Sequence, residues 1–144
     1  MASQLERIVS SALGVDLSPR VVQSNTVAAS PSAATETTIC TITIPAAASQ
    51  ASGILLFGFA AFTVGTSGAS ANLKIRQTGT SGTTISATGA TTGGITAGNL
   101  VDMNVQGFDA AGVLPGQVYV LTLTVGSGAA TSTVSAASLV ALVV

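Results

Sequence analysis

Hydrophobic residues are most concentrated in Gly53–Val64, which reads GILLFGFAAFTV and holds three of the four phenylalanines, Phe57, Phe59 and Phe62. A strand that buries one face alternates apolar with polar residues, but this stretch is apolar at both alternating sets of positions. It is too short to cross a bilayer as a helix, which needs about 20 residues. Its Phe, Ile and Val residues, together with Gly58, favour a strand. The pattern predicts a strand covered on both sides, with one side facing a neighbouring subunit.

Turn-forming residues divide the rest of the chain into short stretches, several of which alternate apolar and polar positions. In Ala71–Thr78, for example, Leu73 and Ile75 alternate with Lys74 and Arg76. We expect strands at Glu36–Ile44, Gly53–Val64, Ala71–Thr78, Thr83–Thr88 (weak), Asn99–Gln106, Gln117–Val125 and Thr133–Val144, with an edge strand near Arg20–Val27. Loops are expected at Gly89–Gly98 and at Asp109–Gly116, which ends in a Pro-Gly turn. The sequence therefore predicts an all-β fold, an antiparallel β-sandwich of jelly-roll type.

The last strand repeats the two-sided apolar pattern near its end. Leu139, Ala141 and Val143 fall on one face, and Val140, Leu142 and Val144 fall on the other. A thin sandwich cannot cover both faces of two such strands. We therefore expect these strands to contribute a subunit contact made by Leu55, Phe57, Phe59, Val140 and Leu142.

The N-terminal part has a different, helical period. Ser3 and Glu6 form a capping box, and Gly14 stands where a helix C-cap belongs. One apolar stripe with helical spacing lies between them: Leu5, Ile8, Val9, Ala12 and Leu13. We expect a short helix over 3–13 and an extended linker, together an arm over 1–34, followed by the β-domain over 35–144. A helix this short is marginal alone, so the stripe docks either on its own domain or on a partner.

Composition narrows the function. Only 6% of the residues are charged and the net charge is −1, so no basic patch is available for nucleic acid or for an anionic membrane surface. A protein surface that is nearly neutral and rich in apolar residues tends to self-associate, which suits a subunit of a large assembly. The single cysteine, Cys40, excludes an internal disulfide and is expected to be a small buried residue. The N-terminus does not read as a signal peptide, so we expect synthesis and use without secretion.

Candidate chemistry is sparse. The chain has no histidine, which excludes histidine triads and histidine metal sites. Asp102 and Asp109 are conceivable as a catalytic pair, but the aromatic and polar cleft that such pairs need is missing. Asp102 and Asn104 share one strand face, where we expect solvated side chains and not a calcium site. We expect no catalytic residue, no metal, no cofactor and no small-molecule substrate. Lys74 and Arg76 are interpreted as solvated, or alternatively as paired with Asp102.

Taken in order, these segments resemble a known family. The resemblance rests first on a Thr-rich strand closed by proline (TICTITIPA), the apolar strand GILLFGFAAFTV and a strand containing L-K-I-R. The segments PGQVYVLTLTV and VSAASLVALVV follow. Over roughly 35–144 the chain resembles the jelly-roll, tumour-necrosis-factor-like domains of tailed-bacteriophage virion proteins, most closely the trimeric head-decoration, or cement, proteins.

The resemblance implies a non-enzymatic virion structural protein. It implies a homotrimer, made in the host cytoplasm, that binds the major capsid protein on the capsid exterior and stabilises the particle. In such proteins a segment outside the β-domain often ties it to the capsid, so Leu5, Ile8, Val9, Ala12 and Leu13 are interpreted as a capsid-binding arm. The alternative is a receptor-binding or fibre-tip module of a phage. The Ser-, Thr-, Gly- and Ala-rich loops, in which Phe108 is the only expected ring, favour decoration.

Overall fold

A computed structural model describes residues 20–26, 30–32, 34–45, 53–110, 116–126 and 131–144. These residues form eight strands: β1 (Arg20–Thr26), β2 (Thr37–Thr43), β3 (Ile54–Val64), β4 (Ala69–Gln77), β5 (Thr84–Ile95), β6 (Leu100–Asp109), β7 (Val118–Gly126) and β8 (Ser132–Val143). The described part contains no helix. The expected helix over 3–13 lies outside the described residues.

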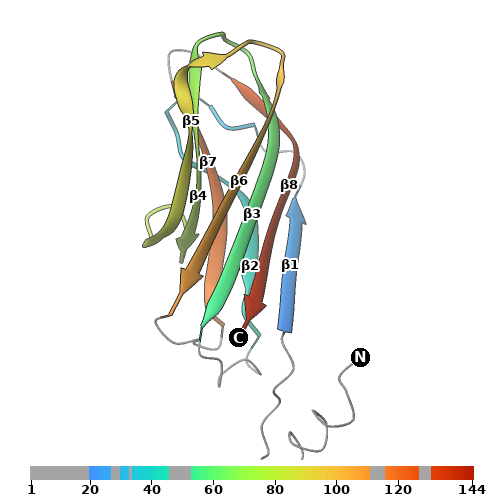
Figure 1. Cartoon of the computed structure of the whole chain (residues 1–144), viewed down its shortest axis with the longest axis vertical. Coiled ribbons are helices and arrows are strands. Elements are labelled where there is room, and N and C mark those ends of the chain that lie inside the picture. Colours follow the sequence, from blue (N-terminus) through green and yellow to red (C-terminus); the bar gives the residue numbers. More distant parts are fainter. Residues whose placement is uncertain (1–19, 27–29, 33, 46–52, 111–115, 127–130) are drawn as a thin grey trace, which may run out of the picture.

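The strands form two four-stranded sheets that pack face to face (Figure 1). One sheet has the order β1-β8-β3-β6 and the other the order β2-β7-β4-β5, and every pairing is antiparallel. The antiparallel β-sandwich expected from the sequence is confirmed. In the view of Figure 1 the β1-β8-β3-β6 sheet lies in front.

The pairing is nested along the chain. β4 pairs with β5, β3 with β6, β2 with β7, and β1 with β8. The remaining pairs, β3 with β8 and β4 with β7, join these hairpin-like units inside each sheet. Only the β4–β5 connection joins neighbouring strands of one sheet, so every other connection crosses between the two sheets.

The core fills the space between the sheets with aliphatic side chains and few rings. The largest fully buried side chains include Tyr119, Phe62 and Leu121, all with 0% exposure. Cys40 is buried at 1% exposure, as expected. Ile39, the neighbour of Cys40 in the same strand, is buried too, although strict alternation would place it on the opposite face. A register shift between Thr38 and Cys40 explains this, because a bulge breaks the strict alternation of faces.

The strand boundaries agree only in part with those expected. β5 continues to Ile95, through residues that were expected to form a loop, because β4 supplies backbone partners as far as the pair Ala69–Ile95. β1 lies inside the range assigned to the arm and forms the edge of a sheet, as expected for Arg20–Val27. The division of the chain at residue 34 stays a prediction.

Candidate functional site: the outer face of the β1-β8-β3-β6 sheet

The two faces of β3 have different surroundings. One alternating set, which includes Ile54, Leu56 and Phe62, is fully buried between the sheets. The other set points away from the core, where Leu55 and Phe59 are half-buried and Phe57 is 46% exposed. The two-sided apolar pattern thus has one covered face and one open face in the single chain.

Strand register arranges the open face in rows that run across the sheet. The first row contains four apolar side chains in adjacent strands, Val21, Leu142, Leu55 and Phe108. Val21 is 65% exposed and Phe108 is 52% exposed. We call Val21, Leu142, Leu55 and Phe108 the apolar row.

Apolar character decreases in the rows further along the sheet. In the second row Phe57 lies between Val140 and Gln106. In the third row Phe59 lies between Ser138 and Asn104, and in the fourth Ala61 lies between Ala136 and Asp102. The open face is therefore apolar at the end where β1 begins. Along β6 it is polar at Gln106, Asn104 and Asp102, which lie between the exposed apolar residues Phe108 and Leu100.

All five residues expected at a subunit contact lie on this one face. Leu55, Phe57 and Phe59 come from β3, and Val140 and Leu142 come from the adjacent β8. The register places Leu55 opposite Leu142 and Phe57 opposite Val140. The structure thus brings these residues together, while their role in a trimer stays a prediction. The five residues assigned to a capsid-binding arm lie outside the described residues.

Sequence reasoning missed two members of the apolar row. Val21 was included only in the expected edge strand near Arg20–Val27, and Phe108 was placed in a loop beyond the expected strand Asn99–Gln106. β6 runs to Asp109, so Phe108 is a strand residue opposite Leu55. The available signal was that the alternation of faces continues two residues past the expected strand end. It places Phe108 on the same face as Gln106, Asn104 and Asp102.

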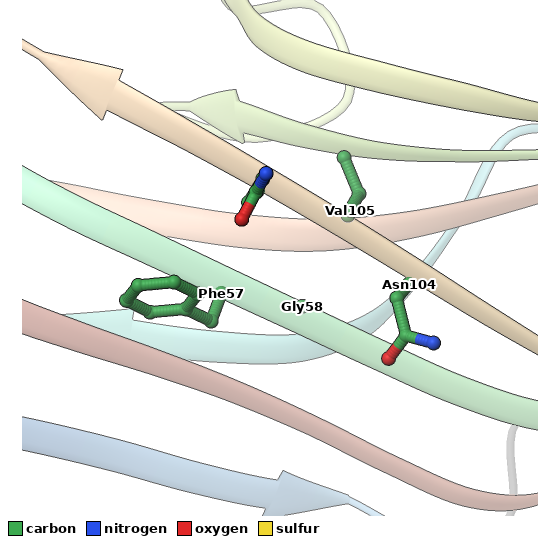
Figure 2. Close-up of a pocket in the computed structure, with 5 residues that line it drawn as sticks. Phe57, Gly58, Asn104 and Val105 are labelled. Atoms are coloured by element: carbon green, nitrogen blue, oxygen red, sulfur yellow. The ribbon is translucent and has the colours of Figure 1, made fainter.

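A shallow pocket lies on this face between β3 and β6 (Figure 2). It has a volume of about 410 Å³ and is lined by Phe57, Gly58, Asn104, Val105 and Gln106. Gly58 belongs to the inward-facing set, and a Cβ there would lie 2.5 Å from Leu121 Cδ1 and 2.9 Å from Val105 Cγ1. A side chain cannot enter at Gly58 without displacing the core. The pocket therefore offers one exposed ring and two exposed carboxamides, with no charged group among its lining residues.

The outer face of the other sheet carries a compact charged cluster. The Glu36 carboxylate accepts hydrogen bonds from Arg76 Nη2 at 2.8 Å, Thr122 Oγ1 at 2.6 Å and Lys74 Nζ at 3.3 Å, and another from Arg76 Nε. This corrects the expected alternatives for Lys74 and Arg76, since they are neither simply solvated nor paired with Asp102. Asp102 lies on the open face of the opposite sheet.

Each charged side chain of the cluster has a hydrogen-bond partner within the chain. The Arg76 hydrogen bond is the main reason that the pKa of Glu36 falls to about 2, with Thr122 and Lys74 adding to the effect against the cost of burial. The same partnership raises the pKa of Arg76. Arg76 Nη1 also donates to the Gly82 carbonyl at 2.9 Å and to Thr84 Oγ1 at 2.7 Å. Glu36, Lys74 and Arg76 therefore all have partners within the chain.

The two carboxylates considered for catalysis do not form a pair. Asp102 is exposed on the open face, whereas Asp109 is buried and points the other way because the two lie seven positions apart on one strand. Asp109 Oδ2 accepts a hydrogen bond from Tyr119 Oη at 2.7 Å and one from Gln117 Nε2 at 3.3 Å. Burial and the neighbouring carboxylate raise the pKa of Tyr119. This arrangement closes one end of the core.

Neither a metal-binding cluster nor a membrane-spanning helix occurs in the described ranges. No group of three or more His, Cys, Asp or Glu residues there is placed to hold a metal ion. Within the same ranges, no helix has the length and apolar character needed to cross a membrane.

The fold is similar to solved structures of a virus. No protein-family model matches the chain, and no curated protein matches it. The infectious bursal disease virus VP2 subviral particle aligns with a TM-score of 0.61 and 19% identity, covering 87% of this chain and 33% of that chain. A structure of the Gx strain of the same virus gives a TM-score of 0.60 and 18% identity, covering 87% and 32%. This chain thus spans about a third of the length of those viral chains, and at this identity the likeness concerns the fold.

Proposed function

We propose that the chain is a virion structural protein with a jelly-roll domain. The nested pairing supports the jelly roll, because eight strands ordered β1-β8-β3-β6 and β2-β7-β4-β5 correspond to two interlocked Greek keys wrapped into two sheets. The fold shared with VP2, which forms a subviral particle, supports a place in a particle. The described part offers binding faces and no assembled catalytic group.

The more specific role that we propose is capsid decoration. In this role the protein is a homotrimer that binds the major capsid protein on the capsid exterior and stabilises the particle. The single observation that carries the proposal is the open apolar face, on which Leu55, Phe57, Phe59, Val140 and Leu142 lie together. Exposed apolar patches of this kind mark protein–protein contacts. Burying the face in a trimer removes it from water and leaves the polar faces outside.

Co-purification with particles tests this role. Particles are isolated, and the ratio of this chain to the major capsid protein is measured by quantitative mass spectrometry. A decoration protein gives a fixed ratio that matches threefold or quasi-threefold positions, and its removal lowers the temperature at which the particle opens. Absence from purified particles, or a ratio of only a few copies per particle, would contradict decoration.

A second candidate is the receptor-binding or fibre-tip module, which the pocket favours. Phe57, Asn104 and Gln106 present a ring beside two carboxamides, a combination able to stack on a neutral sugar and hydrogen-bond its hydroxyls. Binding of the intact protein to a panel of neutral oligosaccharides tests it. Saturable binding that Asn104→Ala abolishes supports the receptor role, and no binding at millimolar sugar removes it.

A further inference from the structure

The apolar row lies at the end of the sheet where the described chain begins. Arg20 pairs with Val143, and the next pair, Val21 with Leu142, belongs to the row itself. The described chain therefore enters this sheet beside the row. Figure 1 shows β1 as the outermost strand of this sheet, beginning at the end where β8 finishes.

The dimensions of the row match those of the helix that the sequence predicts over 3–13. Four strands spaced about 4.8 Å apart give the row a length of about 14 Å. A helix over 3–13 has a length of about 16 Å at 1.5 Å per residue. Its five-residue stripe is apolar, as the row is. The connection over 14–19 reaches about 20 Å when extended, which is enough to place the stripe on an adjacent molecule.

We propose that the N-terminal segment, residues 1–17, of a second copy of this chain packs across the apolar row. This inference rests on the proposed homotrimer and specifies one of its contacts. The remaining apolar residues of the open face, Val140, Phe57 and Phe59, continue directly from the row. A neighbour whose domain covers these three residues therefore has the row next to it, and its own segment completes the cover.

Charge supports this occupant. The row carries no charged side chain, and the acidic residue of this face, Asp102, lies three rows away. The stripe is equally free of charge along its apolar side. This assignment gives Leu5, Ile8, Val9, Ala12 and Leu13 a different partner from the capsid contact that the sequence resemblance implied, so the test has to separate the two.

Disulfide trapping identifies the occupant directly. Ile8→Cys and Leu142→Cys are combined in the full chain with Cys40→Ser, and the protein is oxidised under mild conditions. The expected result is covalently linked chains on a non-reducing gel, with the Ile8–Leu142 bridge between copies identified by mass spectrometry. The matched control combines Ile8→Cys with Thr41→Cys, an exposed position on the other sheet, and is expected to stay unlinked. A bridge within one chain, or no bridge in a protein that is trimeric by light scattering, overturns the proposal.

A charge scan separates this inference from the proposed function. Ile8→Asp lies on the stripe and Ser10→Asp lies off it. The expected result is a roughly tenfold or larger rise in the trimer dissociation constant for Ile8→Asp, and little change for Ser10→Asp. If Ile8→Asp leaves the trimer intact and abolishes binding to particles, the segment contacts the capsid, so this inference fails while decoration stands. If the unaltered protein is monomeric, the proposed trimer itself fails.

Discussion

The outer faces of the two sheets differ in how far the chain itself covers their side chains. On the β2-β7-β4-β5 sheet, Thr122 is fully buried because Glu36 and its cationic partners lie over it. On the β1-β8-β3-β6 sheet, Phe57 and Phe108 stay about half exposed. The charged side chains of the first face are partly covered by contacts within the chain. The second face leaves aromatic rings partly in water, which does not stabilise an isolated domain. In the proposed function, the first face therefore serves the stability of the domain and the second serves assembly.

The largest expected effect comes from placing a charge on the open face. Phe57→Asp is expected to abolish the trimer, because a buried unpaired carboxylate costs several kcal/mol. The measurement is the mass in solution by light scattering. Thr41→Asp, an exposed change on the other sheet, is the control and keeps the trimer. If Phe57→Asp gives a trimer of unchanged stability, Phe57 is an ordinary exposed residue and the comparison of the two faces loses its meaning.

Removing the centre of the charged cluster has the next largest effect. Glu36→Ala is expected to lower the free energy of unfolding by about 1–3 kcal/mol, since Lys74 and Arg76 then stay partly buried without their carboxylate. Denaturant unfolding measures it. Asp102→Ala removes an exposed carboxylate from the open face and changes stability by less than about 0.5 kcal/mol. Equal effects of the two changes would show that the cluster is only a surface ion pair.

The pH dependence of stability follows from the same cluster. Folding lowers the pKa of Glu36 from an ordinary 4.5 to about 2, so the unfolded chain binds this proton first. The stabilisation is complete above the ordinary pKa and is lost as the pH falls from about 5 towards 2. Unfolding midpoints measured across this interval are expected to fall with pH, and Glu36→Gln flattens the slope. A Glu36→Gln protein with the slope of the unaltered one would refute the assignment.

The smallest effect concerns the polar end of the core. Tyr119→Phe deletes the hydroxyl that donates to Asp109 at 2.7 Å and that accepts from Gln117 at 2.7 Å. We expect a loss of about 1 kcal/mol in the free energy of unfolding and no change in oligomeric state. Thermal unfolding followed with light scattering checks both. Dissociation of the trimer by Tyr119→Phe would show that assembly depends on the core and not only on the open face.

Local patterns predicted the strands because side chains alternate between the two faces of a strand with a period of two. In Gly53–Val64 the period of two divided the residues into two sets, but both sets are apolar, and the structure shows that the set with Ile54, Leu56 and Phe62 is the buried one. Stretches without that signal were misjudged, as in β5, where Thr and Gly residues form a strand because β4 offers them backbone partners. The bulge that buries Ile39 is equally a consequence of pairing with β7.

Contacts between segments that are distant in the chain could not be predicted from the sequence. The partner of Arg76 is Glu36, forty residues earlier in the chain, whereas the sequence analysis considered only solvation or pairing with Asp102. The apolar row joins Val21, Leu142, Leu55 and Phe108 from four strands, and its existence depends on the strand order and register of the sheet. Strand order in turn is set by packing between the sheets, which no single period encodes.

The central claim is that the open face is buried between copies of the chain. Hydrogen exchange of the unaltered protein tests it most directly when the mass is measured by light scattering in the same solutions over a dilution series. The account predicts a mass of three chains at high concentration, with exchange of the β3 and β8 amides speeding up as dilution releases monomers. The β2 and β7 amides change less. A monomer at every concentration, with equal exchange behaviour of the two sheets, would contradict it.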